Sequence, residues 1–234
     1  MSENLNQDYL RFSKEITKSS KSIFKIQGTI LTIFKKHHKS IYSIALIISK
    51  LKKEISVDNQ LVFLAEILSD LLIVTRLAFL GFESCALIVL RRIIENFYNH
   101  IYYTDHSIEF QHLNLGKNEY TPIEKLKTYF DTHPNFSQIE DPNLKDFNGL
   151  LFKEYQQLCK VVHSKGIDAL NLAECLKDLT EVFDLEAFLK LTINIELYIV
   201  YLSYKFHKNI KFTATEKGVI TSIIPTNKRN YLNV

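Results

Sequence analysis

The clearest hydrophobic pattern in the chain lies between Gly81 and Asp105, where apolar residues recur at intervals of three and four. This spacing places them on one side of an α-helix. The apolar side comprises Ala86, Val89, Leu90, Ile93, Ile94, Phe97 and Ile101. The remaining sides carry the polar set Arg91, Arg92, Glu95, Asn96 and Asn99. The pattern therefore predicts a long amphipathic helix that packs on a core and presents cationic and amide groups elsewhere.

A second strongly apolar stretch, Leu61–Leu80, comes directly before this helix, and Gly81 separates the two. Glycine accommodates tight turns, and each stretch has one strongly apolar side. We therefore expect an antiparallel helical hairpin. One continuous helix running through Gly81 is the alternative.

Most of the remaining chain also has helical periodicity. Helices are predicted over Asn4–Lys53 with a break at Gly28 or at Lys35–Ser40, from Asp141-Pro142 to about Ser164, over Asn171–Leu179, from Thr180 to about Asn209, and after the Thr213–Glu216 capping box. Between residues 104 and 144 the periodicity weakens, and we expect a helix from Thr121-Pro122 and a surface loop over Asp131–Asn143.

These elements predict a single all-α bundle of about six to eight helices. Within it we expect basic N-terminal helices over residues 1–60, a bundle core over residues 61–212, and a short helix with a basic tail over residues 213–234.

Composition supports a helical protein. The 234 residues are 46% hydrophobic and 24% charged, as in ordinary globular proteins, but they include only six glycines and four prolines. A sheet protein would need more turn residues. The net charge is +3, yet residues 1–60 hold 11 Lys/Arg against 5 Asp/Glu, and residues 205–234 hold 6 Lys/Arg against a single acid. Basic ends of this kind are compatible with nucleic-acid binding and equally with a solvated surface.

The three cysteines, Cys85, Cys159 and Cys175, have no CxxC spacing, and their odd number argues against a disulfide framework. The N-terminus lacks the apolar segment of a signal peptide. The two most apolar windows, residues 61–82 and 185–206, each contain several charged residues that would be costly in a bilayer. We therefore expect a reduced, cytoplasmic protein without membrane contact.

The Arg91–Arg92 pair is the first candidate for chemistry. Arg91 and Glu95 stand at i, i+4 and can form a salt bridge, while Arg92 can pair with Asp70 or Glu66 of the preceding helix. An arginine left free in a cleft would instead suit a phosphate group, because its planar fork donates two parallel hydrogen bonds.

His163, at the C-terminal end of a predicted helix, is the second candidate. A histidine there often stabilises the helix through its dipole. Histidine is also the side chain best suited to acid–base catalysis near neutral pH. Gln156 and Lys160 share its side of the helix, and together with Asn96 and Asn99 they are the candidate binding residues.

No metal or cofactor is expected. Glu109 and His112 have the Glu-x-x-His spacing of di-iron bundles, but those proteins need a second copy of the motif and two further carboxylates. The sequence also lacks a phosphate-binding P-loop, a GxGxxG turn and the GxSxG motif of serine hydrolases.

Short motifs on both sides of these candidates resemble a known superfamily. Gly81-Phe82, Ala86, Leu90-Arg91 and Glu95, followed by Tyr155-x-x-Leu158 and Val162-His163-Ser164, resemble the HEPN (higher eukaryotes and prokaryotes nucleotide-binding) superfamily, in particular its uncharacterised bacterial branches. The resemblance covers about Leu61–Leu202. It implies a helical bundle, usually a homodimer, in toxin–antitoxin, abortive-infection or antiviral defence systems. Active members of the superfamily are metal-independent ribonucleases.

The resemblance also implies a catalytic motif in which an arginine is followed, four to six residues later, by a histidine on the same helix. The histidine acts in acid–base catalysis and the arginine steadies the phosphate, in a cleft shared by two protomers. His163 fits this histidine, but the three allowed arginine positions hold Gln156, Gln157 and Leu158, and Lys160 is too close.

Three hypotheses follow. Arg91 or Arg92 supplies the missing cation from another helix, which would give a composite ribonuclease site with His163. Alternatively, the domain has lost catalysis and binds RNA or a partner protein as a regulatory module of a defence system. A small-molecule-binding bundle is the third hypothesis, and it requires a formed internal pocket.

Overall fold

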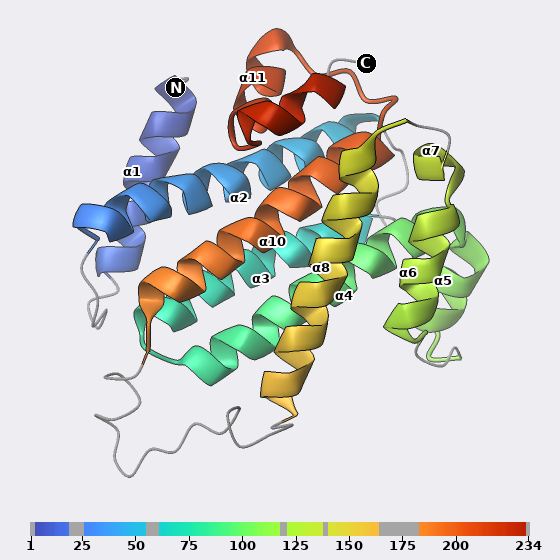
Figure 1. Cartoon of the computed structure of the whole chain (residues 1–234), viewed down its shortest axis with the longest axis horizontal. Coiled ribbons are helices and arrows are strands. Elements are labelled where there is room, and N and C mark those ends of the chain that lie inside the picture. The colour runs from blue at the N-terminus through green and yellow to red at the C-terminus, as the bar shows by residue number, and fades with distance from the viewer. Residues whose placement is uncertain are drawn as a thin grey trace.

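The computed structural model of the chain describes residues 3–18, 26–54, 61–117, 121–137, 140–163 and 183–232. Within these ranges the chain is helical between short connections and contains no β-strand, which confirms the predicted all-α class (Figure 1). The helices are α1 (Glu3–Lys18), α2 (Gly28–Glu54), α3 (Val62–Phe79), α4 (Glu83–Asp105), α5 (Ser107–Asn114), α6 (Ile123–Thr132), α7 (Pro134–Ser137), α8 (Pro142–Val162), α10 (Leu185–Phe206), α11 (Ala214–Ser222) and the 3₁₀ helix η3 (Thr226–Tyr231).

The long helices α2, α3, α4, α8 and α10 form the centre of the bundle. α3 packs along α4, α10 packs along α2, and α8 contacts both α4 and α10. Figure 1 shows α8 crossing over these two helices, with α5, α6 and α7 grouped beyond one end of α4. α1 and α11 both pack on α2. α8 and α4 therefore share an interface that runs through the middle of the molecule.

The predicted hairpin of α3 and α4 is confirmed. Gly81 forms the turn with a φ of 78°, a backbone conformation that favours glycine. The turn is closed by hydrogen bonds from Gly81 N to Ala78 O (3.0 Å) and from Phe82 N to Leu77 O (2.9 Å). The apolar side of α4 is buried in the core as expected.

Several helices also begin at the residues that the sequence predicted as breaks or caps. α2 begins at Gly28, one of the two predicted breaks, with a φ of 57°. Asp141 caps α8 by accepting a hydrogen bond from Asn143 N (3.0 Å). Thr213 and Glu216 form the predicted capping box at the start of α11. α10 begins at Leu185, later than the predicted Thr180, and the predicted helix Asn171–Leu179 lies outside the described residues.

The region expected to hold a loop over Asp131–Asn143 is more helical than the sequence indicated. It contains α7, and α5 precedes it, so the described residues hold more helices than the six to eight expected. The reason is an aromatic anchor. Phe136 of α7 is buried and stacks on Phe130 of α6 with ring centres 4.0 Å apart. The neighbouring Phe206 of α10 lies 5.7 Å away, so a single helical turn is held against the core.

Cys85 and Cys159 are free thiols, and Cys175 lies outside the described residues. In the part of the chain that the structure describes, no helix combines the length and the apolar character that crossing a bilayer would require.

Two histidines meet where α4 approaches the end of α10. His100 Nε2 lies 2.9 Å from His207 Nε2. Burial, together with the neighbouring His100, lowers the pKa of His207 well below its usual range. The folded protein therefore keeps His207 neutral at pH values where the unfolded chain binds a proton.

A consequence is that the free energy of unfolding falls as pH drops below the value at which an unfolded histidine titrates, about 6.5. The variant His207→Gln cannot take up this proton in either state, so it is expected to lose less stability than the wild type between pH 7.5 and pH 5.5. Urea unfolding at the two pH values measures the difference. His112→Gln, which replaces an exposed histidine of α5, is the matched control. Equal pH dependence in wild type and His207→Gln would contradict the prediction.

Candidate functional site

The packing of α8 on α4 brings Arg91 and His163 together. Arg91 Nη1 lies 3.0 Å from His163 Nε2, although the two residues are 72 positions apart in the chain. The guanidinium can act as a donor and never as an acceptor, so Nε2 must accept this hydrogen bond. The contact therefore requires a neutral imidazole that carries its proton on Nδ1.

The position of His163 follows from the end of α8. Apolar residues at positions 151, 155 and 158 are buried on one side of the helix and fix α8 on the bundle. His163 is the C-cap, and its backbone N–H bonds to Cys159 O at 3.0 Å. Its side chain is exposed, whereas Arg91 is about one-fifth exposed, with a side-chain value of 22%. The pair thus lies at the surface, where a solute can reach the imidazole.

Arg91 is held in turn by Glu95 and Tyr155. Arg91 Nη2 lies 3.4 Å from Glu95 Oε1, which confirms the expected i, i+4 ion pair. Tyr155 Oη, from α8, donates to the same carboxylate oxygen at 3.3 Å. Arg91 Nε is buried and has no hydrogen-bond acceptor among the described residues. These contacts form one polar chain from Tyr155 through Glu95 and Arg91 to His163.

Tyr155 is the site residue that reasoning from sequence missed. In the sequence it stands out only as part of the Tyr155-x-x-Leu158 motif of the resemblance, and no role was predicted for it. Its spacing gave no clear signal, because eight residues place Tyr155 about 80° from His163 around α8. What could not be foreseen is that Glu95 of α4 lies within reach of its hydroxyl.

Arg92 points to a different partner. Its Nε donates to Asp70 Oδ2 at 2.8 Å, and its Nη2 donates to Asp70 Oδ1, so the pair is bidentate. Asp70 is 1% exposed, whereas the Arg92 side chain is 47% exposed. These hydrogen bonds raise the pKa of Arg92 above its ordinary value. The structure does not bring Arg92 to His163, and its role is to join α4 to α3.

The two adjacent arginines should therefore differ in their effect on stability. Arg92→Ala leaves the buried Asp70 carboxylate without its cation. We expect the free energy of unfolding to fall by about 2–3 kcal/mol, at the lower end for a broken buried ion pair because Arg92 is half exposed. Arg91→Ala should cost less than about 1 kcal/mol, because its partner Glu95 is more exposed than Asp70 and keeps its hydrogen bond from Tyr155. Urea unfolding of both variants makes the comparison. Equal losses would contradict this assignment, and adding Asp70→Asn to Arg92→Ala should recover part of the loss.

The four candidate binding residues differ in how exposed they are. Asn96 is 7% exposed, contrary to its expected place on the polar side, because α4 is contacted by α3, α6, α8 and α10 and is buried around much of its circumference. Asn99 is half-buried, and Gln156 and Lys160 are exposed on α8. Within the described ranges, none of these four side chains makes a hydrogen bond or ion pair with Arg91 or His163.

Metal ligands are not clustered in the described part of the chain, where no group of three or more His, Cys, Asp or Glu side chains could hold an ion. Glu109 and His112 both lie on the short helix α5. A guanidinium beside an imidazole offers a different chemistry. The cation can bind an anionic oxygen, and the imidazole can take up and return a proton.

Comparison with known proteins adds no relative. No protein-family model, no curated protein and no solved structure matches the chain. The contact between Arg91 and His163 is therefore the observation on which a functional assignment has to rest.

Proposed function

We propose that this protein is a HEPN-like, metal-independent ribonuclease whose catalytic groups, Arg91 and His163, come from two different helices. The observation that carries the proposal is the 3.0 Å contact between them at the surface. It supplies the pairing of cation and imidazole that the resemblance implies, although His163 has no arginine four to six residues before it in the sequence.

The proposed reaction is transesterification followed by departure of the downstream RNA fragment. The ribose 2′-oxygen attacks the adjacent phosphorus, a new P–O bond forms, and the bond from phosphorus to the 5′-oxygen breaks. The products are a 2′,3′-cyclic phosphate and a 5′-hydroxyl. His163 takes the proton from the 2′-hydroxyl, and an imidazolium returns a proton to the leaving 5′-oxygen. Arg91 binds a non-bridging phosphate oxygen, where charge builds up in the transition state.

Arg91 has two roles in this scheme. Without RNA it donates to His163 Nε2 and so occupies the lone pair that a general base needs. A phosphate that draws the guanidinium away frees that lone pair at the moment the substrate is in place. Glu95 limits how far Arg91 can move, because it binds the other terminal nitrogen, and Tyr155 in turn donates to Glu95.

The cellular setting is part of the same proposal. The resemblance implies a bacterial defence or toxin-type system and a homodimer, and the cysteine spacing favours a reduced, cytoplasmic protein. In a homodimer, the partner's copy of the site could supply the imidazolium that protonates the leaving group.

A non-catalytic binding module is the alternative, and one observation favours it. Five large apolar side chains on the α3–α4 hairpin are exposed by 43–50%, namely Val62, Leu72, Ile73, Phe82 and Ile88. They lie on two helices that pack together and on the turn between them, and a contiguous exposed apolar patch is typical of protein contact sites. On this hypothesis the hairpin docks a partner protein and the Arg91–His163 contact is structural.

Expression in a bacterial host distinguishes the ribonuclease from the non-catalytic binding module. Wild-type protein, His163→Ala, Arg91→Ala and the control Lys153→Ala, which changes an exposed lysine of α8, are compared for growth and for intact total RNA. The nuclease proposal expects growth arrest and RNA fragments with wild type and Lys153→Ala, and neither effect with the other two. Fragmentation that persists in His163→Ala would overturn it, and intact RNA in every strain, with a co-purifying protein, would favour the binding module.

A further inference from the structure

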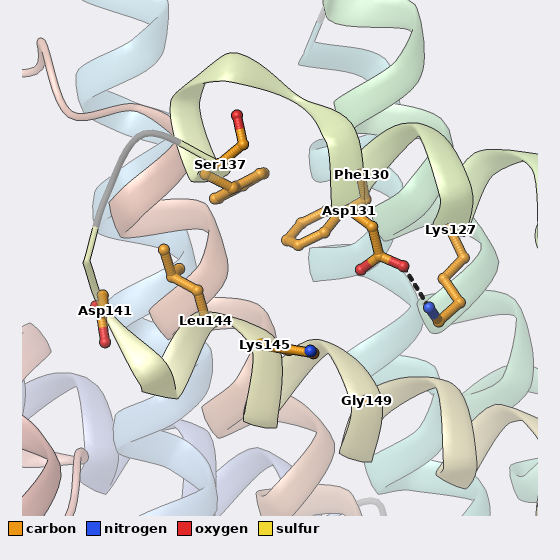
Figure 2. Close-up of a pocket in the computed structure, with 9 residues that line it drawn as sticks. Lys127, Phe130, Asp131, Ser137, Asp141, Leu144, Lys145 and Gly149 are labelled. Atoms are coloured by element: carbon orange, nitrogen blue, oxygen red, sulfur yellow. Dashed lines mark hydrogen bonds and ion pairs between the residues drawn. The ribbon is translucent and has the colours of Figure 1, made fainter.

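A second candidate site lies at the opposite end of α8. A cavity of about 590 Å³ opens between α6, α7 and the N-terminal half of α8 (Figure 2). This volume falls within the range of small-ligand sites, about 300–1,000 Å³. Gly149 on its wall stands 14 positions before His163, which corresponds to about 21 Å along a helix. The cavity is therefore separate from the Arg91–His163 site.

The apolar side of the cavity is formed in advance. Phe130 and Phe136 stack with ring centres 4.0 Å apart, and Leu144 of α8 lines the cavity with them. The two rings are held from behind by Tyr98, 6.1 Å from Phe130, and by Phe206, 5.7 Å from Phe136. Because these partners are buried, a ligand would not have to order the apolar side when it binds.

The two carboxylates at the cavity are already engaged. Asp131 is paired with Lys127 through one oxygen and accepts from Asn148 Nδ2 through the other at 2.7 Å. Asp141 accepts from Tyr201 Oη at 2.6 Å and from Asn143 N at 3.0 Å. It also lies 3.3 Å from Lys205 Nζ. Neither carboxylate is left to bind a cationic ligand.

Lys145 is different. It lines the cavity from α8 and forms no hydrogen bond or ion pair with any residue that the structure describes. Figure 2 shows its side chain extending from α8 toward the side of the cavity that α6 forms. The uncompensated charge at this cavity is therefore positive.

Gly149 keeps the α8 wall open. It stands inside the helix, where glycine lowers stability at a cost that alanine would avoid. The fold itself gives no steric reason for this cost, since a Cβ added at Gly149 would meet no atom within 4 Å. The missing side chain leaves space beside Lys145 that a large side chain at this position would fill.

We propose that this cavity binds a small organic anion with a flat aromatic body and a single anionic group. The body would lie along the wall of Phe130, Phe136 and Leu144, and the anionic group would pair with Lys145. This inference does not depend on the proposed ribonuclease activity, because it uses none of the residues of the Arg91–His163 site.

The test is a fluorescence titration with 8-anilinonaphthalene-1-sulfonate, a probe with an aromatic body and one sulfonate. The wild-type protein is expected to bind it at a single saturable site. Lys145→Glu reverses the charge at the cavity, and Gly149→Phe fills the space on the α8 wall. Each should raise the dissociation constant at least tenfold, which corresponds to about 1.4 kcal/mol.

Two matched controls accompany these variants. Lys153→Glu makes the same charge change on α8 away from the cavity, and Gly149→Ala adds only a methyl group where nothing is contacted. Both should bind the probe as the wild type does. Circular dichroism melting curves verify that all four variants are folded. The proposal is overturned if the wild type shows no saturable binding, or if the probe binds the folded Lys145→Glu and Gly149→Phe variants as tightly as the controls.

Discussion

Replacing His163 with alanine is expected to lower the rate of RNA cleavage by about 10²–10⁴-fold, the usual contribution of a positioned acid–base group. Arg91→Ala should lower it by about 10²–10³-fold, because the variant loses a donor to the charge that builds on the phosphate. The double variant should be little worse than His163→Ala alone, since groups that act as a unit are not additive. Initial rates on a fluorescent single-stranded RNA, with purified protein in excess EDTA, measure all three.

The control for this series is Lys153→Ala, which removes a positive charge from the same helix without touching the site. It should cleave at the wild-type rate. Arg91→Lys is informative as well, because it keeps the charge but loses the planar fork, so its rate should fall between wild type and Arg91→Ala. A His163→Ala enzyme that retains the wild-type rate would exclude the proposed role, and so would wild-type cleavage that EDTA abolishes.

The largest expected loss of stability follows from replacing His37 with alanine. His37 of α2 lies with Nδ1 2.7 Å from Glu196 Oε1 of α10, and with Nε2 2.7 Å from Thr75 Oγ1 of α3. The side chains of His37 and Glu196 are fully buried. Their contact joins α2 to α10. Removing the histidine leaves the Glu196 carboxylate buried without this partner. We expect the free energy of unfolding to fall by about 3–5 kcal/mol.

Glu196→Gln should cost much less than His37→Ala. Burial raises the pKa of Glu196, and glutamine removes the charge while it keeps a polar group beside His37 Nδ1, so no unpaired charge is left in the interior. Thr75 remains hydrogen-bonded in His37→Ala, because its hydroxyl donates to Leu71 O at 2.6 Å. Urea unfolding followed by circular dichroism measures both variants, and His112→Ala serves as the exposed-histidine control. If the free energy of unfolding falls by less than about 1 kcal/mol in His37→Ala, the prediction is wrong, because the Glu196 carboxylate then finds another partner.

The hairpin illustrates what the sequence determined. A glycine between two strongly apolar helices is a local signal, and local signals of this kind predicted α3, α4 and the caps of α8 and α11. The short helix α7 escaped prediction because its stability comes from Phe136 stacking on rings distant in sequence. Helical periodicity in the sequence cannot predict a short helix that is stabilised only by tertiary packing.

The candidate site, too, depends on tertiary packing that the sequence does not reveal. The sequence predicted His163 and the two arginines as candidate site residues but could not decide between Arg91 and Arg92. Adjacent residues differ by about 100° around a helix, so the angle at which α8 crosses α4 decides which one reaches His163. In the structure α8 meets Arg91, while Arg92 takes Asp70, one of the two partners expected for it. The cavity beside Lys145 gave no signal in the sequence, since it depends on how three separate helices come together.

The placement of Arg91 and His163 on different helices also has an evolutionary consequence. When both groups occupy one helix, their spacing is fixed by the helical repeat, and an insertion between them destroys the site. Here the intervening chain includes several turns and short helices at the surface, where insertions are tolerated without moving α4 against α8. Lineages that share this arrangement can drift to very different separations in sequence. A search by motif spacing would pass over them, whereas a search for a guanidinium and an imidazole facing each other across two packed helices would find them.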